Sequence, residues 1–405
     1  MITIGERIKK FNKTLLPKEV NYKYKLMAAN PFGFFRGTCH IFYEDLCKYP
    51  DLPYSPINWI SGDLHIENFG SYKGDNRLVY FDINDFDEGL LAPIAWELAR
   101  VITSIFVGFD ALKITDKQAL ESAQLFLKKY TQILCEGKAR YEEPRTATGI
   151  VKRFLKTVAD RKTKTLLKER TKLKRGKLIL DKGKRKQLEI NKNLKNQLIE
   201  HFEPWMKSNN QPPNNYQVLD VCFRLAGTGS VGCRRYMFLI QKIKRPEKFM
   251  LIDMKEATPS CVQPFLKIHQ PKWASQADRT IFIQKIMQNI APAQLSKMDF
   301  KNESYVLKEM QPMEDKINFK ILENNFSDVC RVIDAMGLLT ASAQLRSVSR
   351  LGSCSADELI AFGRDNSWQK QIIDYALVYS KQVNKYFKEY KKVFQKGEMK
   401  EGKTS

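Results

Sequence analysis

The stretch GDLHIENFG (62–70) decides how this chain is interpreted, together with FDINDFDE (81–88), which follows it closely. The first stretch places a carboxylate and a carboxamide, Asp63 and Asn68, five positions apart. Transfer of a phosphoryl group needs a carboxylate that orients the attacking hydroxyl and accepts its proton, and oxygen ligands that hold Mg²⁺ near the phosphate. The spacing therefore predicts Asp63 as a catalytic base and Asn68 as a metal ligand.

The second stretch supplies three further carboxylates at the end of a predicted strand, LVYFDI (78–83). Asp85 is the expected second metal ligand, because Asp85-Phe86-Asp87 most closely resembles the D-F-G metal loop of protein kinases. Asp82 and Asp87 are the alternatives. An acidic turn that caps a helix beginning near Pro93 is the structural explanation of the same residues.

A glycine-rich segment, LAGTGSVGCRR (225–235), lies much later in the chain. Its pattern is G-x-G-x-x-G. A dinucleotide-binding fold needs a helix directly after the third glycine, whereas strand-like residues follow here. A loop between two strands covers the phosphates in kinases. We therefore expect phosphate binding by this loop, with an ordinary hairpin turn as the alternative; the residues are Gly227, Gly229, Ser230 and Gly232.

A lysine, Lys255, stands at the end of the third predicted strand of this region, in MLIDMKEA (250–257). An ammonium group at this place is expected to hold the α- and β-phosphates of a nucleotide, as the lysine of V-A-I-K does in kinases. The predicted helix that follows, 277–290, should carry its acidic partner, but offers only Gln284 and Gln288. A surface lysine is the alternative.

Composition also indicates a class of binding partner and a cellular compartment. The net charge of +23 indicates an anionic partner such as a nucleotide, a phosphorylated substrate or nucleic acid. Eight cysteines without a C-x-x-C spacing and only four histidines argue against a zinc cluster and favour buried thiols in a reducing compartment, so we expect a cytoplasmic protein. The most apolar stretch, 89–109, contains Glu97 and Arg100, which indicates a buried helix and no membrane span.

Composition and predicted secondary structure divide the chain into four segments. We predict a segment with both acidic loops (1–110), a helical part (111–215) and a strand-rich part with the glycine loop and Lys255 (216–318), followed by C-terminal helices (319–405) with Gly337 and Gly352 as breaks. Residues 151–200 carry 18 Lys and Arg and five Asp and Glu, or 13 of the 23 net positive charges. A solvated helical insert, with a turn at Arg175-Gly176, is favoured over a nucleic-acid-binding arm.

The motifs resemble those of the aminoglycoside phosphotransferase and choline kinase superfamily, which has the protein-kinase-like fold. Five motifs in this order, FFRG, GDLHIENFG, NDFDE, GTGSVG and MKEA, resemble more closely the bacterial family called domain of unknown function 2252. The expected fold is α+β and two-lobed. The catalytic loop precedes the glycine loop, the reverse of the usual kinase order, so we infer a circular permutation in which helix 338–349 leads into the catalytic loop.

Three further residues are candidates on weaker grounds. Glu97 stands where small-molecule kinases, which the chain resembles, carry an Asp that braces the catalytic loop. His65 is expected to contact a phosphate or to hydrogen-bond within the loop. Arg36 is expected to meet a phosphate or to serve a structural role.

Together these features predict an ATP- and Mg²⁺-dependent phosphotransferase whose acceptor, a hydroxyl or an amine, cannot be read from the sequence. Transfer of AMP on the same fold is one alternative, because it uses the same metal and triphosphate. A non-catalytic nucleotide-binding or nucleic-acid-binding protein is the other.

Overall fold

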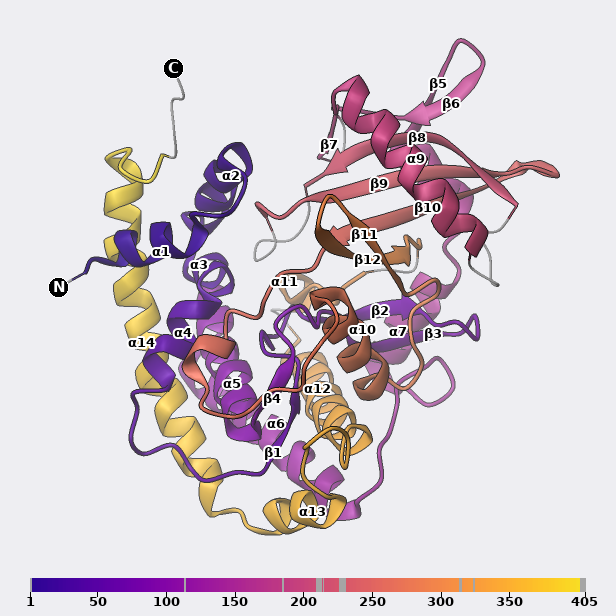
Figure 1. Cartoon of the computed structure of the whole chain (residues 1–405). Helices are drawn as coiled ribbons and strands as arrows, with labels where there is room; N and C mark the ends of the chain where they lie inside the picture. Colours follow the sequence, from indigo (N-terminus) through magenta and orange to yellow (C-terminus); the bar gives the residue numbers. More distant parts are fainter. Residues whose placement is uncertain are drawn as a thin grey trace.

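The computed structural model describes residues 2–112, 114–183, 186–208, 213, 215–225, 231–312, 315–322 and 325–400. It has mixed α and β structure, with a large sheet at the upper right of Figure 1 and helices filling the lower left. The chain starts with four short helices: α1 (Ile4–Asn12), α2 (Pro17–Met27), α3 (Pro31–Gly37) and α4 (Cys39–Leu46).

Helix α3 covers a Phe-rich segment, PFGFFRG, whose composition suggests a loop that enters a helix near residue 38, and the structure corrects this expectation. Local signals for the helix are present, because the Asn30 side chain caps its first turn by accepting a hydrogen bond from the Gly33 amide and Pro31 follows directly. Its phenylalanines Phe34 and Phe35 are almost fully buried. Burial of these rings against the other helices holds the segment in place.

Two short antiparallel hairpins follow and carry the acidic loops. Strand β1 (Ile57–Ile60) pairs with β4 (Leu90–Pro93), and β2 (Phe69–Lys73) pairs with β3 (Val79–Ile83). The polar turn GDNR (74–77) joins β2 to β3. The nested pairing brings the loop after β1 next to the loop after β3.

Helix α5 (Ile94–Ala111) forms the centre of the helical core. Glu97 and Arg100 within it have no exposed surface, so the apolar stretch is a buried core helix as expected. Among the described helices, none is long and apolar enough to cross a membrane. Around it lie α6 (Asp116–Glu136), α7 (Gly149–Ala159), α11 (Phe319–Leu322), α12 (Phe326–Arg346), α13 (Ala356–Arg364) and α14 (Ser367–Gln395).

The main sheet has six antiparallel strands in the order β11-β12-β10-β9-β8-β7. Successive side chains along its strands point to opposite faces of the sheet, and both faces carry an apolar cluster. Helix α9 (Lys192–Ser208) covers one of them, where Phe202 stacks on Phe238 at 4.0 Å. Helix α10 (Gln276–Met287) contacts both β12 and α12, and so connects the sheet to the helical core. The strands are β7 (Gln187–Leu188), β8 (Tyr216–Arg224), β9 (Arg235–Lys242), β10 (Arg245–Glu256), β11 (Ser296–Phe300) and β12 (Glu303–Glu309).

The basic segment 151–200 is only in part the helical insert that was predicted, because three strands lie between its helices. After α8 (Thr163–Arg170) it forms a hairpin of β5 (Thr171–Lys174) and β6 (Lys177–Leu180), and β7 then joins the main sheet. The predicted turn at Arg175-Gly176 is correct, and both residues have positive φ. Residues 187–208 therefore belong with the sheet, so the strand-rich part begins earlier than residue 216.

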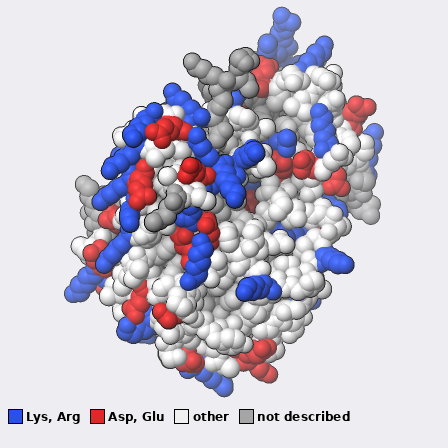
Figure 2. All heavy atoms as spheres, turned by 60° about the vertical axis from the view of Figure 1, so that its left-hand side comes forward, with Lys and Arg blue, Asp and Glu red and all other residues white. Residues whose placement is uncertain are grey.

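The surface charge is distributed in patches of both signs. Figure 2 shows Lys and Arg side chains gathered on the upper part of one face, with Asp and Glu among them, while the lower part carries few charged groups. Several basic side chains of segment 151–200 are also paired, for example Lys172 with Asp181 at 2.8 Å. This mixing of signs is typical of a solvated surface.

Candidate functional site

The two acidic loops touch at a glycine. Gly62, which follows β1, has a φ of +82°, and a Cβ added there would lie 2.1 Å from the carbonyl oxygen of Glu88 in the loop after β3. A side chain is excluded by both the left-handed backbone and this close approach. Glycine at this position therefore allows Asp63 and the 85–88 carboxylates to share one site.

Asp63 is held by a buried arginine. The Nε and Nη2 atoms of Arg100 lie 2.7 and 2.5 Å from its Oδ1, and the guanidinium packs over the ring of Phe35 at 4.2 Å. Burial raises the pKa of Asp63, and the positive charge of Arg100 partly opposes this shift. A carboxylate with a raised pKa is a stronger proton acceptor, which suits a general base. The sequence analysis missed this role of Arg100, although its spacing of three from Glu97 places both on one helix face.

Asn68 is oriented by the same loop. Its Nδ2 donates to the carbonyl oxygen of Asp63 at 2.6 Å, and its backbone amide donates to the carbonyl oxygen of His65 at 2.8 Å. These bonds fix the direction of the side-chain amide relative to Asp63. The amide oxygen is the type of ligand that Mg²⁺ takes.

Asp85 and Asp87 meet Lys255 from the end of β10. The Lys255 Nζ pairs with Asp87 and lies 3.8 Å from Asp85 Oδ1. Burial opposes the charge on the lysine, but the two carboxylates outweigh it and raise the pKa of Lys255. The lysine in turn lowers the pKa of Asp85 against the effect of burial. The predicted lysine and the predicted metal loop are therefore in direct contact.

The acidic partners of Lys255 come from this loop and not from α10. Gln284 and Gln288 bond to each other, and Gln288 also donates to the carbonyl oxygen of Ile83. The contribution of α10 is Arg279, which sequence reasoning missed. Its guanidinium is almost fully buried and donates to the backbone carbonyl of Asp87 at 2.7 Å, which fixes the loop.

Asp82 lies apart from these carboxylates. Its Oδ2 is 3.8 Å from Arg346 Nη1 of α12, and its side chain is 2% exposed. Burial raises the pKa of Asp82 to about 6. The structure therefore places Asp85 and Asp87, but not Asp82, beside Lys255.

Glu97 braces the start of the catalytic loop. Its Oε1 accepts hydrogen bonds from the Ser61 amide at 2.6 Å and the Ser61 hydroxyl at 2.7 Å, and its Oε2 accepts one from Gln344 Nε2 at 2.8 Å. Burial raises the pKa of Glu97. This is the place that the sequence analysis expects for a bracing carboxylate.

His65 and Arg36 stabilise the other side of the loop. Arg36 Nε lies 3.3 Å from His65 Nε2, and its Nη1 pairs with Glu67 at 2.5 Å. The Glu67 amide lies 3.1 Å from His65 Nδ1. Burial lowers the pKa of His65 well below its usual value, so the imidazole is neutral and accepts a hydrogen bond at one of these two nitrogens. The neutral His65 therefore fits a role in hydrogen bonding within the loop, and the paired Arg36 fits a structural role.

The glycine loop falls largely outside the described residues, which exclude Gly227, Gly229 and Ser230. The flanking strands β8 and β9 pair antiparallel, so the strands predicted on both sides of the glycine-rich segment are confirmed. Gly232 has a φ of +108°, and its carbonyl oxygen accepts a hydrogen bond from the Leu16 amide at 3.0 Å. The end of the loop is thus held by the N-terminal segment.

Two cavities lie at these loops. The first, called here the acidic cavity, has about 220 Å³ and is lined by carboxylates from both loops, with Ser61, Cys233, Thr258 and Pro259 and with residues of the N-terminal segment. The carboxylates are Asp63, Asp85, Asp87 and Glu88, and the N-terminal residues are Phe11, Thr14, Leu15 and Lys23. No local sequence pattern points to this N-terminal contribution.

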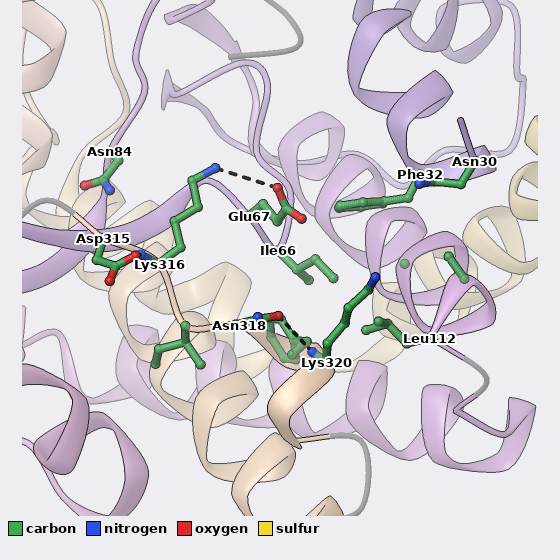
Figure 3. A pocket seen from close by; sticks show the side chains of 14 residues that line it. Asn30, Phe32, Ile66, Glu67, Asn84, Leu112, Asp315, Lys316, Asn318 and Lys320 are labelled. Atoms are coloured by element: carbon green, nitrogen blue, oxygen red, sulfur yellow. Dashed lines mark hydrogen bonds and ion pairs between the residues drawn. The ribbon is translucent and has the colours of Figure 1, made fainter. Parts of the chain in front are cut away.

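The second cavity, called here the linker cavity, has about 650 Å³ and lies beside Ile66 and Glu67 of the catalytic loop. Its opposite wall is the segment Asp315 to Lys320, which follows the main sheet. Figure 3 shows Lys316 reaching across to Glu67, where the two charged groups are 3.7 Å apart. Phe32 adds an aromatic face, so the cavity combines an apolar surface with a few charged groups.

The oxygen donors of the site fit a Mg²⁺ ion that is bound together with water and phosphate better than they fit a metal ion that is bound by protein side chains alone. Across the described parts of the chain, no three His, Cys, Asp or Glu side chains are arranged to hold a metal ion. Mg²⁺ is commonly bound by one or two carboxylates together with water and substrate phosphates. Asp85 and Asn68 would supply the protein ligands in such a site.

The comparisons with known proteins agree with the motif order. The family model described as "Uncharacterized protein conserved in bacteria (DUF2252)" matches residues 15–393. Neither the curated proteins nor the solved structures contain a match. The matched region includes both acidic loops, the glycine loop and Lys255, and the chain belongs to the domain of unknown function 2252 family.

Proposed function

We propose that the protein transfers the terminal phosphoryl group of ATP, with Mg²⁺, to a hydroxyl or amine acceptor. The observation that carries this proposal is the convergence of Asp63 with Asp85, and of Asp85 with Lys255, although Asp85 and Lys255 are 170 positions apart in the chain. A base, a carboxylate metal ligand and a phosphate-binding cation are the groups that phosphoryl transfer requires.

The roles follow from the contacts. Asp63 would orient the acceptor hydroxyl and take its proton, with Arg100 fixing the carboxylate. Asp85 and Asn68 would hold Mg²⁺, which when bound supplies charge neutralisation at the phosphate oxygens. Lys255 would exchange part of its contact with Asp87 for the phosphates.

The two cavities support a division between donor and acceptor. The linker cavity of about 650 Å³ is within the usual size range of small-molecule sites and suits the base and ribose of a nucleotide. The acidic cavity of about 220 Å³ corresponds to roughly seven water molecules at the share each has in the liquid, so we expect a small acceptor or a narrow part of a larger one.

The fold that we propose is two-lobed and protein-kinase-like, with circularly permuted order. It is supported by the contacts between the end of α12 and β1, which would be consecutive in the usual order. The Cys354 amide donates to the carbonyl oxygen of Ile57 at 2.8 Å, and Asn58 Nδ2 donates to that of Gln344 at 2.9 Å. A short connection here would reproduce the helix that leads into the catalytic loop.

The test begins with thermal shifts of the purified protein with ATP, with and without Mg²⁺. We expect a Mg²⁺-dependent shift that weakens in Asp85→Ala and survives in Asp63→Ala, because Asp63 acts on the acceptor. ATP labelled at the α or γ position, incubated with small hydroxyl and amine metabolites, then identifies the group that moves. Transfer of the α label would establish AMP transfer instead, and the absence of any nucleotide-dependent shift would refute the proposal.

A further inference from the structure

The acidic cavity is closed by a segment that belongs to none of the phosphoryl-transfer motifs. Residues 13–16 join α1 to α2, and the Leu16 amide donates to the carbonyl oxygen of Gly232. The Leu15 side chain packs so closely on Gly232 that an added Cβ would lie 2.9 Å from it. The N-terminal helices are therefore attached to the end of the glycine-rich segment and form one wall of the site.

Helix α2 places a buried lysine in this wall. Lys23 is 2% exposed, and its Nζ donates to Asn12 Oδ1 at 3.1 Å. Burial lowers the pKa of Lys23, and the negative charges of Glu88 and Asp63 act in the opposite direction. Lysines are seldom fully buried unless they are paired, and here the Asn12 side chain and the nearby carboxylates compensate for the burial.

Three other cations lie near the carboxylates of the site, and each forms an ion pair. Arg100 is bound to Asp63, and Arg36 is paired with Glu67. Lys255 pairs with Asp85 and Asp87. Among the described residues that line the acidic cavity, Lys23 is the one Lys or Arg.

We propose that Lys23 holds the phosphoryl group during its transfer, as a second cation in addition to Lys255; this inference rests on the proposed function. In the transition state negative charge spreads over the equatorial oxygens of the transferred group, and fixed cations stabilise it. Lys23 lines the same cavity as the base Asp63 and the metal ligand Asp85. The N-terminal helices thereby become part of the catalytic site.

The experiment compares binding of MgADP alone with binding of MgADP plus aluminium fluoride, which occupies the place of the transferred phosphoryl group. Lys23→Met removes the charge, Lys23→Arg keeps it, and Lys25→Met changes an exposed lysine on the same helix as a matched control. We expect aluminium fluoride to tighten MgADP binding to the wild type. Lys23→Met should lose about 100-fold of this gain, similar to the loss of one fixed transition-state donor, with its affinity for MgADP alone unchanged.

The outcomes separate the two proposals. If the wild type binds no magnesium nucleotide, the proposed function fails. If it binds MgADP but aluminium fluoride adds nothing, or if Lys23→Met keeps the full gain, the role of Lys23 is overturned. A structural counter-charge would weaken MgADP binding with and without fluoride equally, which also overturns it. Should Lys23→Met not fold, Lys23→Gln, which keeps a donor for Asn12, replaces it under the same criteria.

Discussion

Replacing Glu97 is expected to disrupt both stability and nucleotide binding, because this carboxylate accepts three hydrogen bonds in the core. Glu97→Ala leaves the Ser61 amide, the Ser61 hydroxyl and Gln344 Nε2 without their acceptor. Each unsatisfied buried donor costs about 1–3 kcal/mol, and a water molecule that enters the new space recovers part of this. The free energy of unfolding should fall by about 3–5 kcal/mol, a large share of the total for a typical domain.

Glu97→Gln preserves the shape of the side chain and one acceptor oxygen, so it should cost only about 1–2 kcal/mol. Urea unfolding followed by circular dichroism measures both variants, with Glu121→Ala on the exposed face of α6 as a control that should change stability by less than about 0.5 kcal/mol. Because Ser61 directly precedes Gly62 and Asp63, we expect the affinity for magnesium nucleotide to fall more in Glu97→Ala than in Glu97→Gln. An Ala variant as stable as the wild type, or less perturbed than the Gln variant, would refute the reasoning.

Three further variants test the surroundings of the site. Burial raises the pKa of Glu142 to about 7 in the folded protein, so ionisation of this carboxyl destabilises the fold as pH rises from about 4.5 to 7. In urea unfolding, Glu142→Gln should therefore raise the free energy of unfolding by about 2–3 kcal/mol at pH 8 and by little at pH 4.5. Arg100→Met leaves the Asp63 carboxylate without its cation and should lower the free energy of unfolding by about 3–5 kcal/mol at pH 7, and unchanged stability would contradict this. Gly337→Ala should destabilise by about 1–3 kcal/mol in the same assay, since its Cβ would lie 2.5 Å from the carbonyl oxygen of Phe126, and a stabilised variant would contradict close packing there.

The parts of the site that lie within one local stretch were predictable from the sequence. The spacing of Asp63 and Asn68 indicated one loop, and the strand that ends before Asp85 was recognisable from its apolar run. The bracing position of Glu97 followed from the resemblance to small-molecule kinases, which carry an Asp at this place. In each case a few neighbouring residues carry the signal, so no knowledge of long-range packing was needed.

The parts that depend on packing between distant segments were not predictable. Gly337 was interpreted as a helix break, but it lies within α12 and allows close contact with α6. The basic segment was interpreted as helical from its charge, although the alternating residues around Arg175-Gly176 also fit a hairpin. Nothing local to Lys23 indicates that it lines the same cavity as Asp63, because its place there depends on how the segment before α2 attaches to Gly232.

The permuted order that we propose has a physical consequence for how the catalytic loop is held. With α12 and β1 consecutive, a covalent bond would fix their relative position. Here hydrogen bonds serve instead, and one chain of them runs from Gln344 on α12 through Glu97 on α5 to Ser61, just before the loop. Each link is fully buried or nearly so, which makes it strong when complete and costly when broken. The loop geometry is therefore tied to the hydrogen bond between Gln344 of α12 and Glu97 of α5, and any change that breaks this bond should loosen Asp63 before it unfolds the protein.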